Sequence, residues 1–88
     1  MSYQIKDVSK SSETIKGAAR DCAEMDVEGA SQQVIENNEE FDPMPGDTEY
    51  LASVCGYDDL NEIPDQVLDL FYSTYRERTR ELLERARS

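Results

Sequence analysis

Histidine and tryptophan are absent from this chain, and cysteine and glycine are scarce. Without histidine, a nucleophile activated by an imidazole base and a histidine-ligated metal site are both excluded. The four glycines form no glycine-rich phosphate loop, and no apolar run approaches the ~20 residues that span a membrane. Asp58, Asp59 and Glu62 lack the central glycine and the ligand spacing of a calcium loop. We therefore expect no enzymatic activity, no cofactor or metal and no membrane contact.

The two cysteines, Cys22 and Cys55, lie far apart and match no metal-ligand spacing. Each falls on the apolar side of a predicted helix, which favours two reduced thiols in the core, with a disulfide as the alternative. The segment Met1–Lys6 lacks the basic and apolar regions of a signal peptide. Together these features favour a cytoplasmic location.

The length of 88 residues and mass of 10.0 kDa predict a single small domain covering residues 1–88. We expect an all-α fold, a bundle of three to four helices in which the C-terminal helix is long. Residues 1–10 are predicted to form an ordered arm or a short strand. The predicted helices cover residues 11–25, 26–40, 48–55 and 64–85, with a loop over 41–47. Because neither glycine nor proline separates the first two helices, one kinked helix is the alternative.

The apolar residues that recur at helical spacing predict the core. In the first helix they are small, which favours close packing against a neighbour. Gly56 is expected to end the third helix in the left-handed conformation. The predicted core consists of Ile15, Cys22, Val34, Leu51, Val54, Val67, Phe71, Tyr75 and Leu82.

Positive charge is missing from the middle of the chain. Lys+Arg number 9 against 20 Asp+Glu, for a net charge of −11. Between Arg20 and Arg76 there are 15 acidic residues and no Lys or Arg. Such uninterrupted repulsion destabilises a compact state, so we expect it to serve another purpose. The explanations are a surface that binds a cationic partner, a solvated face, and a halophilic source.

Four of these acids form a predicted stripe on the helix over residues 26–40. At 100° per residue, Glu28, Glu36, Glu39 and Glu40 fall within about one third of the helix circumference, opposite the apolar residues. The acids of the following loop continue this stripe. Tyr50 and Tyr57 flank the third helix among acids. Ordinary half-buried packing is the simpler explanation for them, and a contact with a partner is the alternative, because tyrosine is favoured at interfaces. The predicted partner-binding residues are Glu28, Glu36, Glu39, Glu40, Asp42, Asp47, Glu49, Tyr50 and Tyr57.

These features predict a protein-binding inhibitor that occupies the cationic site of a nucleic-acid-binding protein or complex. Carboxylates one helical turn apart are spaced like neighbouring phosphates, and arginine clusters pair with both. Direct nucleic-acid binding is not expected of so acidic a chain. In size and charge the chain resembles the small inhibitors carried by phages and mobile elements, such as antirestriction and anti-CRISPR proteins. The alternative is a helical adaptor or small regulatory subunit that binds through an apolar and tyrosine surface.

Five arginines crowd the end of the last predicted helix, between Arg76 and Arg87. Cations are favourable near a helix C-terminus, which accounts for them locally. They could also contact the acidic region of a second copy, which would give a homodimer.

Overall fold

Four α-helices and one 3-10 turn make up the described fold. In chain order these are α1 (Ser2–Glu28), α2 (Gln32–Asn37), α3 (Pro45–Cys55), η1 (Leu60–Glu62) and α4 (Asp65–Arg87). The computed structural model describes the backbone of residues 2–87 and the side chains of residues 12–87. No strand occurs within 2–87. The predicted all-α class with a long C-terminal helix is confirmed.

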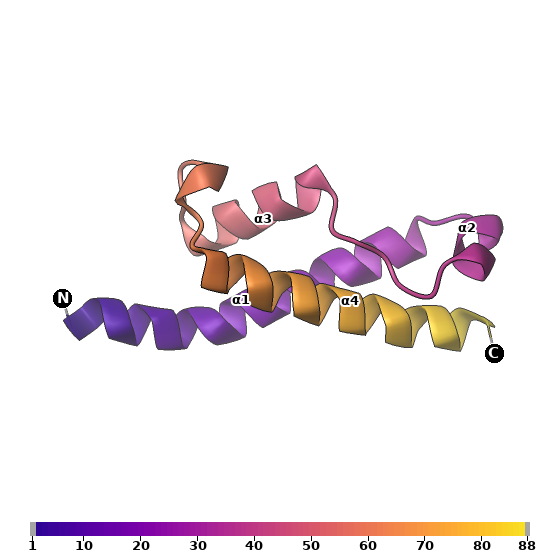
Figure 1. Cartoon of the computed structure of the whole chain (residues 1–88), viewed down its shortest axis with the longest axis horizontal. Coiled ribbons are helices and arrows are strands. Elements are labelled where there is room, and N and C mark those ends of the chain that lie inside the picture. Colours follow the sequence, from indigo (N-terminus) through magenta and orange to yellow (C-terminus); the bar gives the residue numbers. More distant parts are fainter. Residues whose placement is uncertain (1, 88) are drawn as a thin grey trace.

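The two long helices, α1 and α4, lie side by side and form the spine of the molecule (Figure 1). The N-terminal part of α1 extends beyond the start of α4. Helix α3 packs along α1, and α2 lies next to the C-terminal half of α4. The result is an elongated body of 48 × 21 × 16 Å.

The face of α1 that packs inward carries small residues, as predicted. Its buried positions follow helical spacing, and their small size lets α1 approach α3 and α4 closely. Leu51 from α3 and Phe71 and Tyr75 from α4 fill the space opposite this face, each with no exposed surface. The buried positions of α1 in this cluster are Ile15, Ala18, Ala19, Cys22 and Ala23.

The predicted boundary between the first two helices at Asp26 is wrong, and residues 2–10 belong to α1 and do not form the short strand offered as one alternative. From Ser2 onward α1 is one continuous helix that ends at Glu28. Asp26 does not cap a new helix, because its carboxylate accepts a hydrogen bond from the hydroxyl of Tyr75. The second helix is therefore short: Ser31 caps it, and it ends before Asn38, whose side chain bonds the carbonyl of Val34.

Two predicted core residues, Val34 and Val54, are instead 41% exposed. Val34 lies on the six-residue helix α2, which has no buried residue. In α3 the packed side is formed by Leu51, Ala52 and Cys55, and Val54 points about 100° away from it. On α4 the fully buried leucine is Leu83, whereas the predicted Leu82 is partly buried.

Helix α3 begins earlier than predicted, at Pro45, and ends as predicted at Gly56. Proline suits the first helical position, and the Asp47 carboxylate accepts the backbone N–H of Met44 at 2.9 Å. Gly56 has a φ of 83°, and its N–H bonds back to the last turn. The left-handed conformation of Gly56 lets the chain turn toward η1.

Replacing Gly56 with alanine is expected to lower the free energy of unfolding by about 1–2 kcal/mol, because a Cβ is strained at positive φ. Urea denaturation followed by circular dichroism measures this change. Gly46→Ala is the matched control: Gly46 lies inside α3, and an added Cβ would meet no atom within 4 Å. Equal stability of the two variants would contradict the role assigned to Gly56.

Candidate acidic interaction surface

The acids between Arg20 and Arg76 fall into three groups according to their surroundings. The first group is neutralised by arginines of α4. Arg78 lies 2.8 Å from Glu24, Arg76 lies 2.8 Å from Asp42, and Arg80 lies 2.5 Å from Glu40. Three of the five arginines predicted to contact a second copy thus pair with acids of their own chain.

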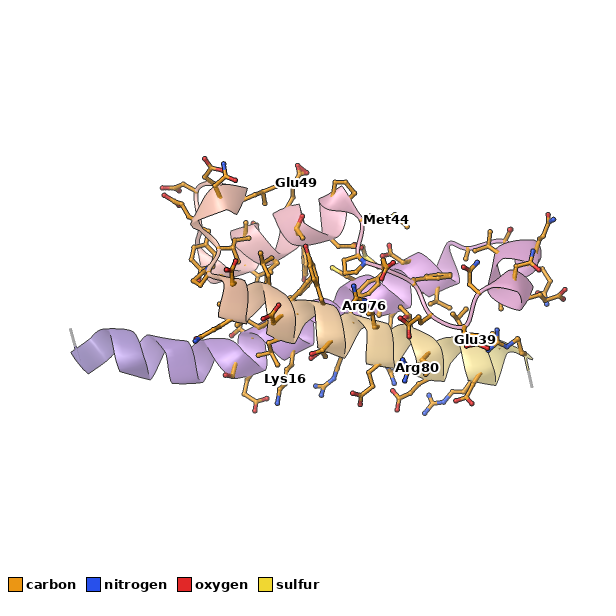
Figure 2. All side chains as sticks on the ribbon, viewed as in Figure 1. Lys16, Glu39, Met44, Glu49, Arg76 and Arg80 are labelled. Carbon is orange, nitrogen blue, oxygen red and sulfur yellow. The ribbon has the colours of Figure 1, made fainter. Side chains whose placement is uncertain are left out.

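These arginines hold the segment between α2 and α3 against α4. Besides the pairs of Arg76 and Arg80, Arg87 donates to the carbonyls of Ile35 and Asn38 at 3.1 and 2.6 Å. The backbone N–H of Phe41 donates to the hydroxyl of the fully buried Thr79 at 3.1 Å. Figure 2 shows Arg76 and Arg80 on the part of α4 that this segment crosses. The connection between α2 and α3 is therefore held against α4.

Replacing both Arg76 and Arg80 with glutamine is expected to loosen this segment. Exposed ion pairs contribute about 0–1 kcal/mol each, so the global loss should be small. The local effect should appear as faster hydrogen exchange of the Phe41 amide, which bonds to Thr79. Arg85→Gln is the control, because Arg85 forms no ion pair within residues 12–87. Unchanged protection of Phe41 in the double variant would show that the pairs do not hold the segment.

The second group comprises two acids turned toward the interior, Asp26 of α1 and Asp47 of α3. The hydroxyl of Tyr75 in α4 donates to Asp26 at 2.5 Å, so the cluster joins three helices. Burial, followed by the adjoining Asp47 carboxyl, raises the pKa of Asp26 to about 6, although the Tyr75 hydrogen bond opposes the shift. Asp47 is only 6% exposed. It is therefore not presented to a partner as the sequence suggested.

The third group holds ten of the 15 acids, which are exposed and form no ion pair with a cation in the described part of the chain. They occur on all four α-helices and on the connections. They are Asp21, Glu28, Glu36, Glu39, Glu49, Asp58, Asp59, Glu62, Asp65 and Asp69.

Several acids of the third group gather where α3 meets η1. Glu49, Asp58 and Asp59 line a shallow hollow together with Tyr57 and Leu60. The connection is ordered by its own acids: Asp59 accepts the N–H of Asn61, and Glu62 accepts the N–H of Asp58, both at 3.1 Å. The sequence shows Asp58, Asp59 and Glu62 as a run of acids before a helix. It does not show that Glu49 of α3 lies beside them.

The four acids predicted to share one helical stripe do not lie on one helix. Glu28 ends α1, Glu36 is in α2, and Glu39 lies in the connection that follows. Figure 2 shows Glu39 near the C-terminal half of α4 and Glu49 on the outer side of α3. The structure thus places Glu36 and Glu39 on one side, the α2 side, and Glu49, Asp58 and Asp59 on another, the α3–η1 side. Glu28 lines a separate hollow with Tyr50.

The two tyrosines among the predicted contact residues differ in exposure. Tyr50 is 41% exposed, and its hydroxyl donates to Asp21 at 3.4 Å. The charge of Asp21 raises the pKa of Tyr50 above its ordinary value. Tyr57 is half-buried and packs against the core. Tyr50 is therefore the more accessible of the two.

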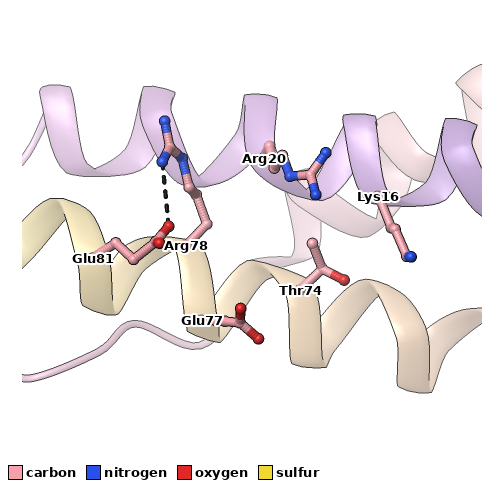
Figure 3. Close-up of a pocket in the computed structure, with 6 residues that line it drawn as sticks. All are labelled: Lys16, Arg20, Thr74, Glu77, Arg78 and Glu81. Atoms are coloured by element: carbon pink, nitrogen blue, oxygen red, sulfur yellow. Dashed lines mark hydrogen bonds and ion pairs between the residues drawn. The ribbon is translucent and has the colours of Figure 1, made fainter.

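Unlike the acidic surfaces described above, a groove between α1 and α4 carries both cations and carboxylates. It is lined by Lys16 and Arg20 of α1 and by Glu77, Arg78 and Glu81 of α4 (Figure 3). Arg78 is occupied by Glu24 and Glu81 at 2.8 and 3.2 Å. Because cations and carboxylates alternate here, this groove offers no continuous cationic surface to a phosphate backbone.

Within residues 12–87, no group of three or more His, Cys, Asp or Glu side chains could hold a metal ion. Both cysteines are free thiols. Burial, followed by the charge of Asp47, raises the pKa of Cys22 to about 12, so this thiol is protonated at neutral pH. Among the helices described, none is long and apolar enough to cross a membrane.

No protein-family model, curated protein or solved structure matches this chain.

Proposed function

We propose that this chain is a non-enzymatic inhibitor that binds a basic nucleic-acid-handling protein at its cationic site, in place of nucleic acid. The observation that carries the proposal is the third group of acids: ten exposed carboxylates that form no ion pair within residues 12–87. Their mutual repulsion opposes folding, so stability alone does not account for them. Arginine and lysine clusters that bind phosphates also bind carboxylates with strong, charge-assisted hydrogen bonds.

The rigidity of the fold supports this proposal. The acids on the α2 side lie next to a segment held by Arg76 and Arg80, and those on the α3–η1 side lie on hydrogen-bonded turns. Carboxylates held in place lose less conformational entropy on binding than carboxylates on a flexible tail. The proposed contact residues are the exposed acids of the α2 side and of the α3–η1 side, together with Tyr50.

A helical adaptor is the second candidate, and the exposed apolar side chains favour it. Met25 is 65% exposed and Met44 is 52% exposed, and methionine adapts to varied apolar partners. The two candidates differ in their response to salt. Binding through charge weakens as salt rises, whereas apolar docking does not.

The proposal is tested by capturing proteins from a cell lysate on the immobilised full chain and releasing them with increasing sodium chloride or with duplex DNA. We expect a captured protein with a nucleic-acid site that both salt and DNA release, because DNA competes for that site. A partner that resists both would overturn the inhibitor proposal and favour the adaptor.

Pairs of substitutions locate the contact side. Glu36→Gln with Glu39→Gln tests the α2 side, and Glu49→Gln with Asp58→Asn tests the α3–η1 side. Each exposed ion pair contributes about 0–1 kcal/mol, so the double variant of the contact side should bind up to about thirtyfold more weakly in a titration with the captured partner. Glu13→Gln with Glu77→Gln changes the charge equally, outside the acidic segment. An equal loss in all three would show that only net charge matters.

A further inference from the structure

An apolar groove with an acidic rim lies between the end of α1, α2 and the segment that leads to α3. Its volume is about 520 Å³, within the range of sites that hold ligands. Ala30, Val34, Phe41 and Met44 supply apolar surface in it. Val34 and Met44 are 41% and 52% exposed, and Phe41 is half-buried. Large apolar side chains thus gather in the groove and remain accessible.

The charged side chains that line this groove are acidic, and two of them pair with arginines of α4 just outside it. Asp26, Glu40 and Asp42 line it, and no Lys or Arg is among its lining residues. Arg80 bonds Oε1 of Glu40 and Arg76 bonds Oδ1 of Asp42, which fixes the two carboxylates. A carboxylate accepts about four hydrogen bonds, so each can still receive a donor from a partner.

Such a groove suits an apolar side chain that has cations beside it. The apolar surface would bury the anchor, and the fixed carboxylates would receive the cations. A partner without cations would leave the remaining acceptor sites of these carboxylates unused on desolvation.

We propose that this groove binds a segment of the target protein in which an apolar side chain is flanked by lysine or arginine. The inference rests on the proposed function, because it names the part of the basic partner that docks here. Met44 is suited to such a contact, since methionine adjusts its shape to different anchors.

The test follows the backbone amides of the isotope-labelled full chain by NMR during titration with a synthetic amphipathic peptide of lysine and leucine. We expect the largest shifts at Val34, Phe41 and Met44. A peptide with serine in place of leucine should bind at least tenfold more weakly, and one with glutamate in place of lysine should not bind. Equal binding of the leucine and serine peptides would overturn the proposal, because it would reduce the contact to charge.

Matched variants separate this groove from other exposed apolar positions. Val34→Gln with Met44→Gln should weaken peptide binding at least tenfold, whereas Val54→Gln with Leu60→Gln should leave it unchanged. Val54 and Leu60 are 41% and 42% exposed, as Val34 is, but do not line the groove. The opposite result would place the site elsewhere. If the groove amides shifted when the chain alone was concentrated, without peptide, the groove would bind a second copy of the chain. That result would overturn the proposal.

The outcome for the groove is distinguishable from that for the proposed function. If a partner is captured and released by DNA but the groove variants bind it normally, the groove inference fails and the inhibitor proposal stands. If the lysine–leucine peptide binds in the groove but no captured partner is released by DNA, the groove inference stands and the inhibitor proposal fails.

Discussion

Replacing Phe71 with alanine is expected to lower the free energy of unfolding by about 3–5 kcal/mol. Phe71 has no exposed surface, and its ring lies 6.1 Å from that of Tyr72 and 6.4 Å from that of Tyr75, centroid to centroid. Small domains have only about 5–15 kcal/mol of stability, and the net charge of −11 lowers it further. Urea denaturation followed by circular dichroism should show a transition at much lower urea, or none.

Leu60→Ala is the control for this prediction. Leu60 lies in η1 and is 42% exposed, so its truncation should change the free energy of unfolding by no more than about 0.5 kcal/mol. If both variants lost the same stability, the packing of α1 and α3 against Phe71 would not be what holds the helices together.

The long helix and its core face could be predicted because α4 repeats its apolar residues over six turns. Phe71 and Tyr75 are four residues apart, and both are fully buried. Near the C-terminal end the pattern includes both Leu82 and Leu83, and it does not decide between them. The structure buries Leu83, because the choice between adjacent leucines depends on how α4 lies against its neighbours.

The boundary after α1 could not be read from local preferences. Aspartate is a good helix cap, and apolar residues at helical spacing follow Asp26, so local preferences predict a new helix there. In the structure, Asp26 bonds to Tyr75, which is 49 residues away, and the helix continues to Glu28. The Asp26 carboxylate therefore makes a tertiary hydrogen bond with Tyr75 and not the local capping bond that the sequence predicts.

The division of the acids among neutralised, buried and exposed groups also depends on contacts distant in sequence. Arg76 and Asp42 are 34 residues apart, and Arg78 and Glu24 are 54 residues apart. The count of charges predicts an acidic segment, but helical spacing relates only residues three or four apart. The sequence therefore predicted the acidity of the surface and not which acids remain available to a partner.

Stability is expected to increase as the pH falls from about 7.5 to about 5, and Asp26 should account for part of this increase. The pKa of Asp26 is about 6 in the folded chain, against an ordinary value of 3.8. Between these values the folded state holds a proton that the unfolded state releases, so its contribution is complete below pH 3.8 and is lost as the pH rises through 6. Allowing for the partial exposure of Asp26, the effect is about 1–2 kcal/mol. Urea denaturation at each pH measures it.

Asp26→Asn separates this contribution from the general repulsion of a chain with a net charge of −11. An asparagine oxygen can still accept the Tyr75 hydroxyl, and its NH₂ group can donate to Asp47, as the protonated carboxyl does. Asp47 of α3 and Tyr75 of α4 face this position, together with Cys22 of α1, whose protonated thiol carries no charge at these pH values. At about pH 7.5 the variant should therefore be more stable than the parent, and at about pH 5 the difference should shrink. If both proteins lost the same stability between these two pH values, general repulsion alone would explain the pH dependence, and Asp26 would not titrate in this range.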